Sequence, residues 1–277
     1  MKENRKMNKT IDIKELKIIQ QKLLDEFSEY CDKNGLTYYL AYGTLIGAVR
    51  HKGYIPWDDD IDVLMPRPDY ERFIENYNDA SKTSTRVVSH KTNPRYYLSF
   101  AKLINTDTVM QEEVNSDYHI GVNIDIFPLD NLADDYETAK KLIKKAFMYN
   151  EIMLLKNLTF SKERKWYKNA VIGAGRVLST FWSRNKLIDR LNNLGIRKEN
   201  KAFTKYVGLI TGLDACDDRE LFEAEWFKET VKIEFEGHLY SAPAGYDAVL
   251  RRTYGDYMKL PPAEEQVAHH VFRAWYK

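Results

Sequence analysis

In the segment Trp57-Asp58-Asp59-Asp60-Ile61-Asp62-Val63, aspartates occupy the alternate positions 58, 60 and 62, and the fold prediction starts from it. In an extended segment every second side chain points the same way, so Asp58, Asp60 and Asp62 would present three carboxylates along one edge. The negative charges of these carboxylates repel one another unless a cation is bound between them. The segment therefore predicts a site for hard divalent cations, which take carboxylate oxygens and leave positions open for water or substrate phosphates.

Two other interpretations of this segment are weaker. A calcium loop needs Gly at its sixth position and normally Glu at its twelfth, and counting from Asp58 these positions hold Val63 and Asp69. A solvated acidic turn would not normally interleave Ile61 and Val63 as though they were buried on the opposite face. We therefore expect a strand with one acidic edge.

A second carboxylate, Asp125, lies in the apolar run Val122-Asn123-Ile124-Asp125-Ile126-Phe127-Pro128. A carboxylate on a buried strand is costly unless it is paired or bound to a metal. The alternative is a hydrogen bond within the core. Beside the first cluster, Asp125 is the candidate fourth member of a metal site.

Hydrophobic periodicity predicts an α+β fold, with a mixed β-sheet, flanking helices and a mainly helical basic subdomain. The expected helices cover residues 12–34, 43–50, 69–77 and 246–254, together with a Lys-rich helical stretch over 134–194. The expected strands cover residues 37–42, 61–65, 95–104, 108–113 and 121–127, and a hairpin over 230–241 that turns at Glu236-Gly237. We divide the chain into a catalytic core (1–131), a basic helical subdomain (132–230) and a C-terminal hairpin and helix (231–277) that completes the catalytic region.

The composition is that of an ordinary folded protein, with 277 residues, 44% of them hydrophobic and 30% charged. No run approaches the ~20 apolar residues of a membrane span, and the basic, polar N-terminus resembles no signal peptide, so a cytoplasmic protein is expected. Cys31 and Cys216 form no CxxC pattern, which argues against a disulfide framework or a zinc site.

The formal net charge of +1 hides a strong asymmetry. Residues 137–205 contain 17 Lys and Arg against 5 Asp and Glu, a local balance of +12, whereas the remainder has 25 basic and 36 acidic residues, or −11. Within the basic region, the stretch from Trp166 to Trp182 interleaves apolar and basic residues as interfacial segments do. It suggests peripheral contact with the inner membrane face, although a solvated helical face is the commoner role of such a run.

The run Tyr42-Gly43-Thr44-Leu45-Ile46-Gly47-Ala48-Val49-Arg50-His51-Lys52-Gly53, followed by Ile55-Pro56-Trp57-Asp58-Asp59-Asp60-Ile61-Asp62, resembles the signature of the LicD-like phosphocholine transferases. This family belongs to the nucleotidyltransferase superfamily typified by DNA polymerase β. The superfamily pattern of a Gly-Ser helix start, an Asp-x-Asp strand and a third carboxylate on a neighbouring strand corresponds to Gly43-Thr44, to Asp60 with Asp62, and to Asp125.

The run Tyr254-Gly255-Asp256-Tyr257-Met258-Lys259-Leu260-Pro261-Pro262, with His269-His270, is similar to the family's C-terminal signature. The resemblance covers residues 12–130 and 236–270, and the stretch 137–230 matches no motif of the family. For the two histidines, a surface or hydrogen-bonded pair is the favoured interpretation.

The resemblance implies transfer of phosphocholine, or a related phospho-alcohol, from CDP-choline or another CDP-alcohol to a sugar hydroxyl. The acceptor would be a lipid-linked precursor of a cell-surface glycan, such as teichoic acid or lipopolysaccharide, and CMP would leave. Two Mg²⁺ (or Mn²⁺) ions would be held by Asp60 and Asp62, with Asp58 and Asp125 as further ligands and Asp59 facing away. Asp125 would take the acceptor proton.

Five further residues are candidates for binding the donor. Gly43 would let the backbone approach a phosphate, and Thr44 would add a hydroxyl at a helix N-terminus, where free N–H groups favour anions. Arg50 and Lys52 would neutralise the leaving CMP, although basic residues late in a helix also complement its dipole. Trp57 would stack on cytosine, face a choline cation, or pack in the core.

Two rival functions stay open at this stage. A true nucleotidyltransferase would transfer the nucleoside monophosphate and release pyrophosphate. A nucleic-acid-binding module would use the basic region, but it leaves four aspartates without a role, so no nucleic-acid partner is expected.

Overall fold

The computed structural model describes residues 9–111, 118–158, 160, 165–178, 182–195, 203–212, 217–267 and 273–277. Its helices are α1 (Ile13–Asn34), α2 (Tyr42–His51), α3 (Arg67–Ala80), α4 (Tyr136–Asn157), α5 (Trp166–Leu178), α6 (Arg184–Gly195) and α7 (Tyr246–Tyr254). Its strands are β1 (Thr10–Ile11), β2 (Tyr39–Leu40), β3 (Asp62–Pro66), β4 (Thr85–Val88), β5 (Ala101–Asn105), β6 (Thr108–Gln111), β7 (Asn123–Ala133), β8 (Tyr206–Gly208), β9 (Leu221–Glu223), β10 (Thr230–Phe235), β11 (His238–Pro243) and β12 (Arg273–Tyr276).

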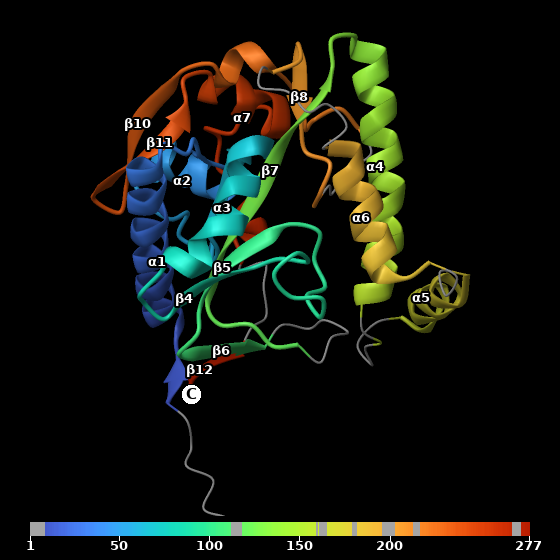
Figure 1. The fold of residues 1–277 in the computed structure, drawn as a ribbon, viewed down its shortest axis with the longest axis horizontal. Coiled ribbons are helices and arrows are strands. Elements are labelled where there is room, and N and C mark those ends of the chain that lie inside the picture. The colour runs from blue at the N-terminus through green and yellow to red at the C-terminus, as the bar shows by residue number, and fades with distance from the viewer. Residues whose placement is uncertain are drawn as a thin grey trace, which may run out of the picture.

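The main sheet has the strand order β2-β3-β7-β5-β4, and β8 and β9 extend it from the far end of β7. Only the β3–β7 pair is parallel among these strand pairs of the described chain. The prediction of an α+β fold with a mixed sheet and flanking helices is thereby confirmed. β7 is the long central strand (Figure 1), and it runs through the predicted domain boundary at residue 131, so that boundary lies within a strand rather than in a linker.

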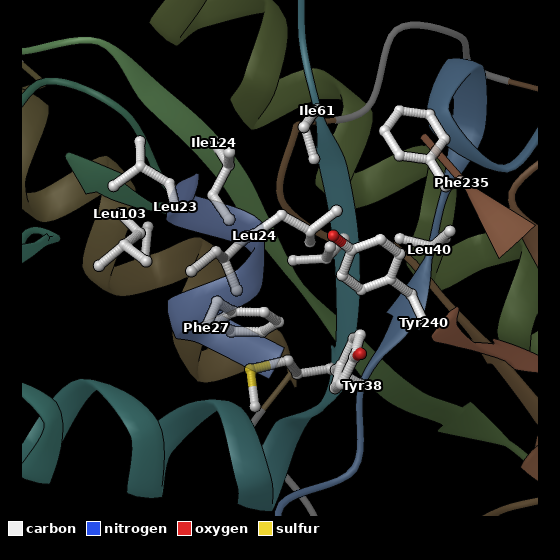
Figure 2. Close-up of a cluster of buried hydrophobic side chains, with 14 of the residues drawn as sticks. Leu23, Leu24, Phe27, Tyr38, Leu40, Ile61, Leu103, Ile124, Phe235 and Tyr240 are labelled. Atoms are coloured by element: carbon white, nitrogen blue, oxygen red, sulfur yellow. The ribbon is translucent and has the colours of Figure 1, made fainter. Parts of the chain in front are cut away.

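Alternation along β3 and β7 divides the buried side chains between two cores. Val63 of β3 and Ile124 of β7 pack with α1 and α3, whereas Leu64 and Leu129 pack with α4 and α6 on the opposite face. Figure 2 shows part of the first core, where Phe27 of α1 lies beside Tyr38, and Leu103 and Ile124 belong to the same cluster. The second core lies on the face of the sheet that also bears the polar residues of the site.

A buried ion pair joins the two sides of the sheet. Arg67 at the start of α3 donates to both carboxylate oxygens of Asp130 on β7, at 2.6 and 2.8 Å, and to Asn192 of α6 at 3.1 Å. Asp130 is fully buried and depends on the charge of Arg67, which is 7% exposed and also lies 3.2 Å from Glu71 Oε1.

Most predicted elements are confirmed, and the differences have local causes. The helix predicted over 12–34 is α1, with Asp12 as its N-cap and Gly35 in the left-handed region at its C-cap. The predicted hairpin is β10–β11, and Glu236 and Gly237 both have positive φ, as a tight two-residue turn requires.

Some strand predictions were wrong in extent. The predicted strand 95–104 begins only at Ala101, and the strand predicted over 37–42 is reduced to β2, since α2 already begins at Tyr42. The short strands β1, β4, β8, β9 and β12 were not predicted. The last residues of the strand predicted over 108–113 lie outside the described residues.

In the basic part of the chain, helices α4 and α6 lie side by side, and α5 lies at one end of α4, far from α1 (Figure 1). This agrees with the helical character predicted for residues 134–194. None of the helices in the described part of the chain has the length and apolar character needed to span a membrane.

Candidate active site

A cleft of about 720 Å³ opens over the face of the sheet that is covered by α4. Four of the five aspartates in the predicted pattern, Asp58, Asp60, Asp62 and Asp125, line it together. The sequence-predicted carboxylates therefore meet in one cavity, although Asp125 is separated from the others by more than sixty positions of sequence.

Strand register brings three charged residues into one row. Asp62 on β3 is the direct partner of Asp125 on β7, and Asp125 is in turn the partner of Lys102 on β5. Lys102 Nζ lies 2.8 Å from Asp125 Oδ1 and also donates to Asn123 Oδ1 at 3.0 Å. Lys102 is buried, so its charge is directed at this row and not at bulk water.

The first aspartates lie in the loop that enters β3. The strand begins only at Asp62, and residues 58–61 precede it without regular structure, so the prediction of a strand through Asp58 and Asp60 was wrong. The predicted alternation nevertheless holds, because Asp58, Asp60 and Asp62 line the cleft and Asp59 does not.

Asp59 is buried at 3% exposure, away from the cleft surface. Gln20 of α1 fixes this part of the loop, since its Nε2 donates to the Asp59 carbonyl at 3.0 Å and to the Asn123 carbonyl at 3.3 Å. The Asp59 carboxylate still lies close to its neighbours, since ligand atoms of Asp58, Asp59 and Asp60 all lie within 4.8 Å of one another.

Like charges and burial oppose ionisation of this cluster. Burial, followed by the charge of Asp60, raises the pKa of Asp58 to about 7. Burial, followed by the charges of Asp60 and Asp125, also holds the pKa of Asp62 well above its usual range, and Lys102 offsets part of this effect. A cleft with such groups favours a bound cation.

The N-terminus of α2 faces these carboxylates. A Cβ on Gly43 would lie 2.4 Å from Asp58 Oδ2, so any larger residue at this position would displace the carboxylate. The preceding Tyr42 has φ of 45°, an uncommon value for a bulky residue, and it also lines the cleft. The start of α2 is therefore shaped around the cleft.

Thr44 has a different position from the one predicted for a phosphate ligand. Its side chain is buried, it does not line the cleft, and its hydroxyl accepts a hydrogen bond from the backbone N–H of Asp62 at 2.9 Å. Thr44 thus joins α2 to the first residue of β3. It acts on the site through Asp62.

Arg50 and Lys52 lie at the other end of α2, and Arg50 is about 10 Å along the helix axis from Gly43, given ~1.5 Å per residue. Arg50 donates to the Tyr257 carbonyl at 2.6 Å, and Lys52 forms the left-handed C-cap of the helix. Neither residue lines the cleft, whereas Trp57 does. Of the predicted donor-binding side chains, the structure places only Trp57 at the cavity.

Sequence reasoning did not identify several residues of the cleft. Lys102 stands between apolar neighbours on a strand that was predicted, and a buried lysine of this kind signals a partner carboxylate. Glu151 of α4 and Arg219 also line the cleft, but they come from a part of the chain without a recognised motif. His269 and His270 lie outside the described residues.

The donor set fits hard divalent cations. Every charged ligand group in the cluster is a carboxylate, and ligand atoms of Asp58, Asp59 and Asp60 lie within reach of one ion. Burial and like charges raise the pKa of Asp58 and of Asp62, and Lys102 offsets only part of this effect at Asp62. Asp58, Asp60, Asp62 and Asp125 are the residues that could hold Mg²⁺ or Mn²⁺ in this cleft.

Comparison with known proteins agrees with the geometry. Residues 35–167 match the family described as "LicD/FKTN/FKRP, nucleotidyltransferase domain". Over 96% of its length the chain is 30% identical to the lipopolysaccharide cholinephosphotransferase LicD of Haemophilus influenzae, 99% of which is covered. Uncharacterized proteins of Rickettsia typhi and Rickettsia prowazekii share 43% identity over 51 residues and 46% over 47 residues, which is 18% and 17% of this chain and 16% and 18% of theirs. The chain therefore belongs to the LicD family of transferases.

Proposed function

We propose that this protein transfers phosphocholine, or a closely related phospho-alcohol, from a CDP-linked donor to a sugar hydroxyl of a cell-surface glycan precursor, with release of CMP. The observation that carries the proposal is the meeting of Asp58, Asp60, Asp62 and Asp125 in one cleft at the N-terminus of α2. Full-length similarity to a lipopolysaccharide cholinephosphotransferase supports the phosphocholine group and the glycan acceptor.

Phosphoryl transfer of this kind is catalysed mainly by positioning and by neutralisation of charge. Mg²⁺ or Mn²⁺, held by Asp58, Asp60, Asp62 and Asp125, would supply the positive charge that binds the donor's phosphates. Gly43 leaves room for the Asp58 carboxylate at the first turn of α2. There the free N–H groups of the helix favour an anion, and no side-chain cap occupies them.

Asp125 is the residue best placed to take the proton of the acceptor hydroxyl. Its Oδ1 is held by Lys102 Nζ at 2.8 Å, which fixes the orientation of the carboxylate. The same row aligns Asp62 beside it, since the two residues are register partners on adjacent parallel strands. A base and a metal ligand are thus side by side on a rigid sheet.

The acceptor side of the proposal involves a lipid-linked glycan at the inner membrane face. Helix α5 exposes Trp166 (80%), Val171 (62%) and Val177 (70%), while Ile172 is buried. Lys165 and Lys168 are exposed at the same end of this helix. Exposed aromatic and apolar side chains near lysines suit the interface of an anionic bilayer.

The product distinguishes this function from nucleotide transfer. With CDP-choline and Mg²⁺, phosphocholine transfer releases CMP, whereas a nucleotidyltransferase given a nucleoside triphosphate releases pyrophosphate. A thermal-shift panel of CDP-choline, CDP-ribitol and CDP-glycerol with Mg²⁺ identifies the donor, because a ligand at ~100 times its Kd stabilises by ~2.7 kcal/mol. No shift with any of the three, or pyrophosphate as the sole product, contradicts the proposal.

Membrane contact is tested by co-sedimentation with liposomes that contain anionic lipid at low salt. Wild-type protein should sediment with these vesicles, and Trp166→Ala should lower the bound fraction, because the indole is the largest exposed apolar group on α5. Val267→Ala, which truncates an exposed apolar residue far along the chain, is the matched control. Equal behaviour of the two variants would exclude α5 as the contact surface.

A further inference from the structure

Two carboxylates of the cleft, Glu151 of α4 and Glu220, lie outside the set of four aspartates proposed to hold metal. Among the described residues that line the cleft, six are acidic and one, Arg219, is basic. Arg219 Nε is already 2.7 Å from Asp217 Oδ2. Glu151 of α4 is exposed in the cleft and forms no ion pair with any other described residue. Its charge is available for a ligand.

An aromatic wall borders this part of the cleft. The rings of Phe100 and Phe127 lie 4.3 Å apart between centroids, and the Tyr42 ring meets Phe127 edge-on at 5.7 Å. All three residues line the cleft. They offer apolar surface and π faces in a cavity whose other wall is acidic.

Contacts through Gly212 connect the wall to the α4 turn that bears Glu151. The Gly212 N–H donates to Asn150 Oδ1 at 3.3 Å, and a Cβ on Gly212 would lie 2.8 Å from the Phe127 ring. Asn150 directly precedes Glu151 on α4. The carboxylate and the aromatic rings therefore belong to one continuous surface.

The spacing of this surface from the aspartates suits a choline group. Phe127 and Asp125 lie on the same face of β7, two residues or roughly 7 Å apart. In phosphocholine, about four single bonds of ~1.5 Å each separate the phosphorus atom from the quaternary nitrogen. A phosphate held at the aspartates can thus present the trimethylammonium group to the wall.

We propose that Tyr42, Phe100, Phe127 and Glu151 form the subsite for the quaternary ammonium group of the donor, and that they set its preference for choline over uncharged alcohols. This inference rests on the proposed function. A quaternary ammonium ion has no N–H to donate, so it is recognised by π faces and by diffuse negative charge rather than by directed hydrogen bonds. Aromatic rings, and a carboxylate that has no ion pair among the described residues, line this one cleft and supply both.

Steady-state kinetics with two donors test the subsite. Glu151→Gln and Phe100→Leu should each lower kcat/KM for CDP-choline about tenfold, and should change kcat/KM for CDP-glycerol less than about twofold, because only the first donor carries the cation. Glu137→Gln, on the same helix and outside the cleft, is the matched control and should behave as wild type with both donors. Equal losses with both donors, or no loss with CDP-choline, would overturn the assignment.

Binding of choline itself separates a wrong subsite from a wrong function. Choline should raise the Tm of the wild type but not that of Glu151→Gln, and its carbon isostere, with tert-butyl in place of trimethylammonium, should raise neither. If no CDP-alcohol is turned over but choline still shows this pattern, the proposed function fails and the subsite stands. If CDP-choline is turned over and choline shows no such pattern, the subsite alone is rejected.

Discussion

Gly43→Ala is the sharpest test of how the aspartate loop is held. A Cβ at this position would lie 2.4 Å from Asp58 Oδ2, whereas ordinary contacts of a Cβ begin near 3.4 Å. The carboxylate must therefore move by about 1 Å. Because the obstructing atom is the end of a side chain, the fold can adapt, and alanine is the better helix former by roughly 0.5–1 kcal/mol.

We expect activity and stability to separate in this variant. A displacement of about 1 Å in a catalytic group costs on the order of 100-fold in rate, so CMP release from CDP-choline should fall by about that factor. The Tm should stay equal or rise slightly. The control is Gly173→Ala in α5, where the nearest atom to an added Cβ is 3.9 Å away. Wild-type turnover by Gly43→Ala would refute the placement of Asp58 in the site.

Three further predictions concern charge and hydrogen bonding. Burial and neighbouring carboxylates raise the pKa of Asp58 to about 7 and also raise that of Asp62, so the metal-free native state holds protons that the unfolded state has lost. The free energy of unfolding should therefore fall as pH rises from about 4 to 7, and Mg²⁺ should raise the Tm more at pH 8 than at pH 5. An equal Mg²⁺ effect at both pH values would contradict a site made of these groups. In urea unfolding, Asp130→Asn should cost about 3 kcal/mol, because the buried Arg67 would keep only Glu71, at 3.2 Å, as a charged partner. Glu225→Gln, from the exposed pair with Lys228, should cost less than about 1 kcal/mol, and similar costs would exclude the buried pair as a structural link. Thr44→Val should lower the free energy of unfolding by about 1–3 kcal/mol and weaken Mg²⁺ binding, because it removes the acceptor for the Asp62 N–H. Thr44→Ser should retain both stability and Mg²⁺ binding. A Thr44→Val protein with wild-type Mg²⁺ affinity would show that Thr44 does not position Asp62.

Local pattern predicted the elements that carry strong periodicity. The α1 helix and the β10–β11 hairpin follow from spacing, caps and turn residues alone. The meeting of Asp62 with Asp125 was also predictable, since both interrupt apolar strands. Their direct pairing depends on the parallel register of β3 and β7, which cannot be predicted from the sequence pattern of either strand.

The remaining parts of the site depend on tertiary arrangement. Lys102 is an ordinary residue in sequence and becomes a partner of Asp125 only because β5 pairs with β7. The position of Arg50 in the motif predicted a phosphate ligand, yet its guanidinium donates a hydrogen bond to the Tyr257 carbonyl of the C-terminal segment. Glu151 enters the cleft because α4 folds over the sheet, which no local pattern predicts.

The central claim is that these aspartates hold the divalent ions that support transfer from a CDP-linked donor. The most direct measurement is Mn²⁺ binding by titration calorimetry, with CMP release followed in parallel, for the wild type, Asp60→Asn and Asp62→Asn. We predict that the wild type binds Mn²⁺ and releases CMP from CDP-choline only with metal present. Each variant should lose at least the roughly 10–100-fold in affinity that removal of an outer-shell partner costs, together with CMP release. Wild-type Mn²⁺ affinity and CMP release in Asp60→Asn and Asp62→Asn would contradict the account.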